Sequence, residues 1–204
     1  MKVAVLGATG ATGTLFTALA LEAGHEVVAL VRNASKLDAN PQLRVIAGDA
    51  TDESAVATIV ENADVVVSCL GHVAGEEPMM SAAFTNIISA ASKQANPPRC
   101  VLMTSIGVGG TSLHVKFVLS TLVAGCKVIA DYERADALVR RSGVPYVLVR
   151  PGHLTNGPSM NKYTTSLKGF YHIAMKIARA DVAKFLLRAS SSAEFENKAV
   201  QLYS

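Results

Sequence analysis

Near its start the chain reads Gly7-Ala-Thr-Gly10-Ala-Thr-Gly13, directly after the apolar run 2–6 and shortly before an apolar segment that begins at Leu15. A buried strand, a glycine-rich turn and the start of a helix, in that order, predict a cradle for a pyrophosphate group. The first glycine permits a tight turn, the second lets backbone N–H groups approach the phosphates, and the third lets the helix pack closely on the strand. The predicted binding residues of this loop are Gly7, Thr9, Gly10, Ala11, Thr12 and Gly13.

The next apolar run, 26–31, ends in Arg32, and Ser35 and Lys36 follow closely. A site for NAD usually carries Asp or Glu at this strand end, where the carboxylate binds the ribose hydroxyls. A guanidinium, a hydroxyl and an ammonium group instead suit a dianionic 2′-phosphate. The alternative is a solvated, mildly basic loop. The missing acid favours NADP(H) as the cofactor, held at this end by Arg32, Ser35 and Lys36.

Composition limits the remaining possibilities. The 204 residues are 50% hydrophobic and 17% charged, which describes one globular domain with an ample core. The formal net charge is only +3 and no stretch carries a dense block of lysine and arginine, so nucleic acid is not an expected partner. Cys69, Cys100 and Cys126 lie in or beside apolar segments, and their spacing indicates no metal site. We expect reduced core cysteines in a cytoplasmic protein, whose oligomeric state the sequence does not give.

Two segments bear on membranes and targeting. The first strand begins within two residues of Met1, so we expect no signal or transit peptide. The apolar run within 113–126 is much shorter than the ~20 residues that a membrane span needs, and His114 and Lys116 interrupt it. We expect a buried or lid-like helical segment there and no membrane span.

Apolar runs and helical periodicity alternate along the whole chain. Strands are predicted at 2–6, 26–31, 43–47, 64–69, 99–104, 145–149 and 198–202, and helices at 12–23, 53–61, 79–95, about 115–142 and 180–190. Pro78 marks a helix start, Pro97-Pro98 precedes the fifth strand, and Asp181 is the predicted N-cap of the last helix. The alternation predicts a single α/β domain over 1–204, a Rossmann-like doubly wound parallel sheet.

Ligands of such a sheet bind beyond the carboxyl ends of its strands, where the strand order reverses. The residues that directly follow the strands are therefore further site candidates. We expect cofactor contacts from Asp49, Ala50, Leu70, Gly71, Thr104, Pro151, Gly152 and Leu154. Ser105 and the turn 151–154 fall where a nicotinamide ring is expected to lie.

The chain resembles the short, atypical branch of the short-chain dehydrogenase/reductase superfamily. The resemblance rests on the glycine loop together with 31–33, Gly48-Asp49, 103–105, 149–152 and 179–183, and these pieces cover nearly the whole chain. Within that branch the chain is most similar to the NAD(P)H-binding group, which includes the biliverdin reductase B (flavin reductase) type and the NmrA-like proteins. The resemblance implies a nicotinamide cofactor.

One departure from the catalytic members limits the chemistry. Classical and epimerase-type relatives carry a tyrosine and, four residues later, a lysine that lowers the tyrosine pKa for acid–base work. Here Tyr132 is followed four residues later by Asp136. We therefore expect neither sugar epimerisation nor ordinary alcohol dehydrogenation, and we expect Tyr132 not to act as an obligate acid.

The flavin-reductase-like group is similar in lacking that pair, and its Ser and His near the nicotinamide match Ser105 and His153 here. These two are the candidate catalytic residues. Two roles remain open for His153. It either acts in the reaction, by donating a proton or contacting an anionic substrate, or it makes a purely structural hydrogen bond.

Two functions remain open. The first is an NADPH-dependent reductase that transfers hydride to a conjugated small-molecule acceptor such as a flavin, a quinone or a linear tetrapyrrole. The second is a non-catalytic NADP(H)-binding regulator or assembly factor of the NmrA-like type. In either case we expect substrate-side lids within about 107–126 and 155–178.

Overall fold

The computed structural model describes residues 1–109, 126–168 and 175–204. Its strands are β1 (Lys2–Leu6), β2 (Glu26–Val31), β3 (Leu43–Ala47), β4 (Val65–Ser68), β5 (Arg99–Met103), β6 (Tyr146–Pro151), β7 (His153–Thr155), β8 (Thr164–Ser166), β9 (Lys176–Ala178) and β10 (Lys198–Tyr203). Its helices are α1 (Ala11–Glu22), α2 (Glu53–Val60), α3 (Met80–Ser92), α5 (Cys126–Arg141) and α6 (Arg179–Ser191), with short 3-10 turns η1 (Ala34–Lys36) and η2 (Ala193–Phe195).

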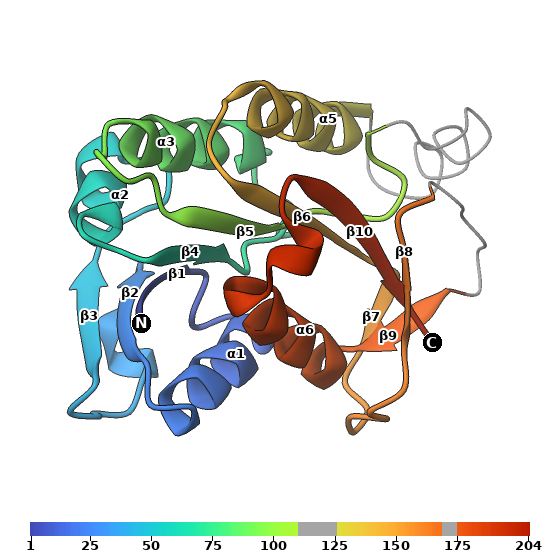
Figure 1. Cartoon of the computed structure of the whole chain (residues 1–204), viewed down its shortest axis with the longest axis horizontal. Coiled ribbons are helices and arrows are strands. Elements are labelled where there is room, and N and C mark those ends of the chain that lie inside the picture. The colour runs from blue at the N-terminus through green and yellow to red at the C-terminus, as the bar shows by residue number, and fades with distance from the viewer. Residues whose placement is uncertain (110–125, 169–174) are drawn as a thin grey trace.

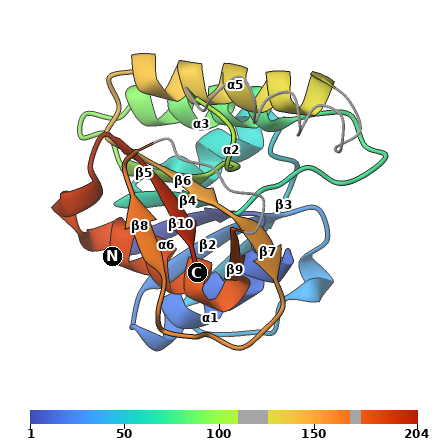
Figure 2. The ribbon, with the colours of Figure 1, turned by 90° about the vertical axis from the view of Figure 1, so that its right-hand side faces the viewer.

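The central sheet lies between two helical layers, with α2, α3 and α5 on one face and α1 and α6 on the other (Figure 1). A view from the side shows the same three layers (Figure 2). Because both faces are covered, the central strands are apolar along their length rather than alternating, and every residue of β4 is buried. Phe84 of α3 fills the core on one face, and Phe16 and Phe185 of α1 and α6 fill it on the other. The expected doubly wound α/β fold is confirmed.

The strand order is β3-β2-β1-β4-β5-β6-β10-β8. β1 lies between β2 and β4 and is parallel to both, so the chain winds outward in one direction before residue 47 and in the other after residue 64. The reversal falls between β1 and β4, which end at Leu6 and Ser68. The carboxyl ends of these two strands therefore open the crevice in which such sheets bind ligands.

Three short strands were not anticipated from the sequence. β7 and β9 form a separate two-stranded parallel sheet, and β8 runs antiparallel to β10 at the edge of the main sheet. Each is only three residues long, which is too short to show a pattern of alternating polarity. Of the expected helix 115–142, the described part is α5.

The prediction that Asp181 is the N-cap of the last helix is wrong. β9 runs directly into α6, and Ala178, in extended conformation, is the N-cap. Asp181 is instead fully buried in the first turn. Its carboxylate accepts hydrogen bonds from the Ser159 hydroxyl at 2.5 Å and the Met160 N–H at 3.0 Å. The residue therefore fixes the loop after β7 against α6.

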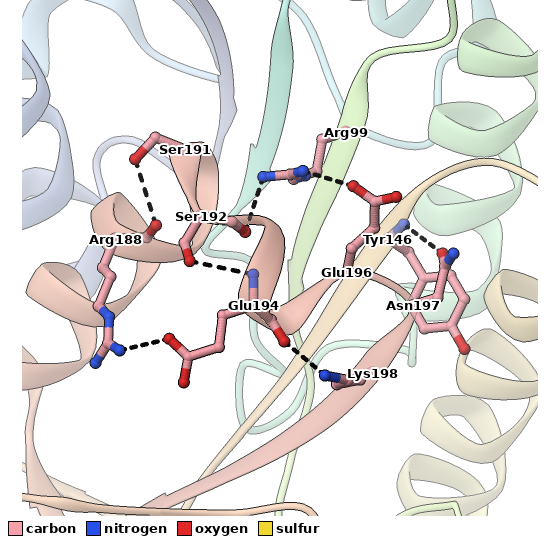
Figure 3. A network of polar contacts seen from close by, with 9 residues as sticks. All are labelled: Arg99, Tyr146, Arg188, Ser191, Ser192, Glu194, Glu196, Asn197 and Lys198. Atoms are coloured by element: carbon pink, nitrogen blue, oxygen red, sulfur yellow. Dashed lines mark hydrogen bonds and ion pairs between the residues drawn. The ribbon is translucent and has the colours of Figure 1, made fainter.

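At the amino ends of β5, β6 and β10 a polar network joins the strands to the end of α6 (Figure 3). The Arg99 guanidinium donates to the Glu196 carboxylate at 2.5 Å and to the Ser192 carbonyl at 3.0 Å. The backbone N–H of Tyr146 donates to the side chain of Asn197 at 3.3 Å. This edge lies opposite the crevice, so the network supports the sheet rather than the site.

A buried ion pair connects β6 to α5. An Arg150 guanidinium nitrogen lies 2.5 Å from an Asp136 carboxylate oxygen, and the two side chains are 5% and 2% exposed. Arg150 also donates to the carbonyl of Gly109 at 3.3 Å, and Arg140 pairs with Asp136 at 2.6 Å. The pair thus fixes the segment that follows β5 against the helix above it.

Replacing Asp136 by Ala leaves the buried Arg150 charge without its carboxylate. We expect Asp136→Ala to lower the free energy of unfolding by about 3–5 kcal/mol. Urea denaturation followed by circular dichroism measures the change. Asp38→Ala, at an exposed loop position, is the matched control and is expected to change stability by less than about 0.5 kcal/mol. Equal losses in the two variants would contradict this account.

Candidate functional site

Two cavities lie along the carboxyl edge of the sheet. The first cavity, of about 240 Å³, opens at the ends of β1, β2 and β4. The second cavity, of about 520 Å³, opens at the ends of β5 and β6 and beneath α5. Gly71 lines both, so the two cavities adjoin at this residue.

The glycine loop turns off β1 under tight steric limits. Gly7 has φ +78°, and a Cβ there would lie 3.0 Å from the backbone of Cys69 and Leu70, which follow β4. A Cβ on Gly13 would lie 2.0 Å from the Gly7 carbonyl oxygen. Only glycine lets the loop pass so close to the neighbouring strand and to the first turn of α1.

The start of α1 faces the first cavity with unused donors. Gly10 is the N-cap, and its own N–H donates to the Gly7 carbonyl at 3.0 Å. The N–H groups of Ala11, Thr12 and Gly13 have no acceptor within the described part of the chain. No side chain caps this end and its first turn carries no acid. An uncapped helix start of this kind attracts an anion.

Most of the residues that the sequence predicted as cofactor contacts after β1, β2, β3 and β4 line the first cavity. Those that do so are Gly7, Thr9, Gly10, Arg32, Lys36, Asp49, Ala50, Leu70 and Gly71. Ala11, Thr12 and Gly13 are not among the residues that line this cavity, and Thr12 and Gly13 are buried while Ala11 is exposed. The side chain of Ser35 lies outside the described residues.

The far end of the first cavity carries charges of both signs. The Arg32 guanidinium lies 3.4 Å from the carboxylate of Glu76, a residue that the sequence gave no reason to select. Asp49 accepts hydrogen bonds from the N–H and hydroxyl of Thr51 at 2.9 and 2.7 Å. These bonds hold the Asp49 pKa below its usual value, and the nearby Arg32 charge lowers it further.

The second cavity brings together the candidate residues that follow β5 and β6. Its lining includes Thr104, Ser105, Pro151, Gly152, His153 and Leu154. The Ser105 hydroxyl donates to the Ile106 carbonyl at 3.1 Å, and the His153 backbone N–H donates to the Met175 carbonyl at 2.9 Å. The His153 side chain is exposed. Most of the remaining wall is apolar, with Met103, Ile106, Val128, Ile129 and Met175.

Tyr132 of α5 lies in the wall of the same cavity. Its hydroxyl accepts a hydrogen bond from the His72 N–H at 3.2 Å, and burial raises its pKa. Asp136, at the position where relatives carry lysine, faces Arg150 instead. The environment therefore keeps the phenol protonated, which is the reverse of what a lysine partner does.

Arg179 at the start of α6 also lines the second cavity and was not selected as a site residue. Its guanidinium donates to the side chain of Asn156 at 2.6 Å and to the Leu154 carbonyl at 3.4 Å. Both acceptors are neutral, so its charge remains available to an anionic ligand. The sequence offered one signal, because Arg179 opens a segment, 179–183, that carries the family resemblance.

Several expectations fall on other parts of the chain. Residues 110–125 and 169–174, which belong to the two predicted lids, lie outside the described residues, as does the side chain of Cys126. Cys69 and Cys100 are buried free thiols, and burial raises the pKa of each to about 12. Within the described ranges, no three His, Cys, Asp or Glu side chains gather to hold a metal ion. None of the described helices combines the length and apolar character needed to cross a membrane.

Comparison with known proteins places this site in context. A family model described as NAD(P)H-binding matches residues 7–192. A chloroplastic protein of Arabidopsis thaliana, described as uncharacterized, is 30% identical over 172 residues, which are 77% of this chain. The chain spans only 60% of the length of that relative.

Solved structures superpose along the whole chain. The anaerobillin reductase ChuY from Escherichia coli O157:H7 is 25% identical, with a TM-score of 0.83, and the match covers 100% of this chain and 97% of ChuY. A short-chain dehydrogenase/reductase from Veillonella parvula, solved in complex with NADP, is 19% identical, with a TM-score of 0.81, and the match covers 100% and 94% of the two chains.

The glycine loop gives two variants with opposite expected effects. A Cβ at Gly10 comes no closer than 3.3 Å to the Gly7 carbonyl oxygen, so Gly10→Val folds but fills the space where a pyrophosphate meets the backbone. Gly13→Val clashes with the Gly7 carbonyl and loses stability. Circular dichroism and fluorescence titration with NADPH separate the two. Ala18→Val, on the exposed side of α1, is the control that keeps both fold and binding. Normal NADPH binding by Gly10→Val would exclude this loop as the phosphate site.

Proposed function

Because the chain belongs to the NAD(P)H-binding family, we propose that it is an NADPH-dependent reductase that transfers hydride to a conjugated small-molecule acceptor such as a flavin, a quinone or a linear tetrapyrrole. The observation that carries the proposal is the pair of cavities that meet at Gly71. One offers an uncapped helix start and cations, and the other offers apolar walls with a few polar groups. This division matches a dinucleotide beside an acceptor.

The residues of the first cavity fit the charged half of the cofactor. The N–H groups at the start of α1 would bind the pyrophosphate, and Gly7 lets the loop that carries them pass close to the chain after β4. Arg32 and Lys36 bind the 2′-phosphate of the adenosine ribose. When bound, the reduced nicotinamide supplies the hydride. Thr104, Pro151, Gly152 and Leu154 surround its ring.

The residues of the second cavity fit the acceptor. Its apolar walls and volume of about 520 Å³ suit a planar conjugated molecule, since small-molecule pockets typically span ~300–1,000 Å³. Arg179 donates to neutral acceptors among the described residues, and in this proposal it binds a carboxylate or phosphate on that molecule. A linear tetrapyrrole and a flavin nucleotide both carry such groups, and the similarity to an anaerobillin reductase supports this class of acceptor.

Proton supply in this proposal does not depend on a tyrosine–lysine pair. Hydride adds at an electron-poor conjugated centre, so His153 or solvent delivers the proton afterwards. Ser105 orients the nicotinamide amide or the acceptor. The free thiols Cys69 and Cys100 are consistent with a reducing compartment, and we include a cytoplasmic location in the proposal.

A non-catalytic NADP(H)-binding regulator of the NmrA-like type is the second candidate. Asp136 at the lysine position and the raised pKa of Tyr132 favour it, because both remove the usual acid–base machinery. Steady-state NADPH oxidation with a panel of flavins, quinones and biliverdin decides between the two. Tight NADPH binding without turnover of any acceptor would favour the regulator.

Arg32 is expected to set a preference for the phosphorylated cofactor. Because a charge-assisted contact contributes ~1.5–3 kcal/mol, NADPH should bind at least about tenfold more tightly than NADH. Fluorescence titration of wild-type protein and Arg32→Ala with both reduced cofactors measures this. Arg44→Ala, at an exposed position on β3, is the control that keeps the preference. Equal affinities in the wild type, or an unchanged preference in Arg32→Ala, would refute the assignment.

The acid–base roles give a further expectation. His153→Ala should lower turnover by about 10²–10⁴-fold if His153 donates the proton, and only slightly if it positions the acceptor. Tyr132→Phe should be nearly silent, because Tyr132 lacks a lysine and stays protonated. Turnover and KM are measured for each variant with the best acceptor of the panel. A loss of about a hundredfold in Tyr132→Phe would restore the usual tyrosine mechanism.

A further inference from the structure

The first cavity contains a carboxylate where an anionic group of the ligand is expected. One Arg32 nitrogen, Nη1, lies 3.4 Å from Oε1 and 3.5 Å from Oε2 of Glu76. Both residues line the cavity, and their side chains are 65% and 45% exposed. The carboxylate thus lies against one nitrogen of the guanidinium that the proposal assigns to the 2′-phosphate.

Backbone N–H groups make hydrogen bonds at Glu76 itself and four residues after it, at Met80. The Glu76 N–H donates to the Val73 carbonyl at 3.1 Å, and Gly75, with φ +86°, completes this turn. Shortly afterwards α3 begins, and its first residue, Met80, donates its N–H to the buried Asp131 carboxylate of α5 at 2.7 Å. The segment between β4 and α3 is therefore anchored at the first residue of α3, four residues after Glu76.

The remaining charges do not offset the carboxylate. Asp49 adds a second negative group at this end and is already held by Thr51. Among the salt bridges of the described residues, none involves Lys36. An incoming 2′-phosphate therefore meets one unpaired ammonium group and one guanidinium that a carboxylate already binds.

We infer that Glu76 is a specificity-determining residue, whose carboxylate competes with the 2′-phosphate of NADP(H) for Arg32 and so narrows the preference of this chain for NADP(H) over NAD(H). A dianionic phosphate must displace the carboxylate and then lies beside it, and both steps weaken binding. An unphosphorylated ribose leaves the ion pair intact, and its 2′-hydroxyl is a donor that suits a carboxylate. The inference rests on the proposed dinucleotide site and adds how that site discriminates between the two cofactors.

Glu76→Gln tests the inference because it removes the charge and keeps the shape. Isothermal titration calorimetry measures the affinity for NADPH and NADH and for two fragments, adenosine 2′,5′-bisphosphate and adenosine 5′-monophosphate. We expect Glu76→Gln to bind NADPH and the bisphosphate about two- to fivefold more tightly than the wild type. NADH and the monophosphate should bind no more tightly than before. The wild type and Glu77→Gln, the exposed neighbour in the same turn, should behave alike.

A double-mutant cycle shows whether the effect acts through Arg32. In the Arg32→Ala background, Glu76→Gln is expected to give a smaller gain for the bisphosphate, because only the direct repulsion between the carboxylate and the phosphate is then relieved. An unchanged or weaker NADPH affinity in Glu76→Gln, or the same gain with and without Arg32, would overturn the inference. Nucleotide selectivity that follows this pattern in a protein that reduces no acceptor would overturn the proposed reductase and leave the inference standing. Absence of any nucleotide binding would overturn both.

Discussion

The site depends on one close backbone approach, between the turn after β1 and the end of β4. Gly7 passes so near to Cys69 and Leu70 that a single Cβ would touch their backbone, and Gly13 lets α1 begin against the same turn. This contact sits where the strand order reverses, between β1 and β4. It therefore fixes the helix start, with its unused N–H groups, directly above the crevice. The two cavities are placed relative to each other by the same piece of backbone, because Leu70 lines the first cavity and Gly71 lines both.

The position that carries lysine in related enzymes has a different role here. Asp136 takes part in a buried ion pair with Arg150, which fixes the segment after β5 through the Gly109 carbonyl. Tyr132, one turn earlier on α5, is left in an apolar wall where burial raises its pKa. The helix that would supply acid–base catalysis thus supplies structural support. With Asp136 in place of the lysine, the site is compatible with a reaction that needs little acid catalysis.

The arginine side chains of the two cavities differ in the charge of their partners. In the first cavity Arg32 is paired with Glu76, and in our inference a 2′-phosphate competes with this contact. In the second cavity the hydrogen-bond acceptors of Arg179 among the described residues, the Leu154 carbonyl and the Asn156 side chain, are both neutral. In the proposed function, discrimination between cofactors and recognition of the acceptor therefore depend on separate guanidinium groups, Arg32 after β2 and Arg179 at the start of α6.

The amino-acid sequence by itself determined the family, the α/β class, the seven principal strands and the residues that follow them, because these depend on local periodicity and on glycine's freedom from a Cβ. It also indicated that Ser105 and His153 share one cavity, since carboxyl ends of parallel strands meet at one edge. Only the tertiary structure showed Asp181 as a loop anchor rather than a helix cap, and only it brought Glu76 to Arg32 and Arg179 to the acceptor cavity. Asp181 and its partner Asn161 lie 20 positions apart in the chain, and Arg32 and Glu76 lie 44 positions apart. Arg179 meets residues that follow the distant strands β5 and β6. No local pattern encodes them, because side chains that meet through a fold need no particular spacing in the sequence.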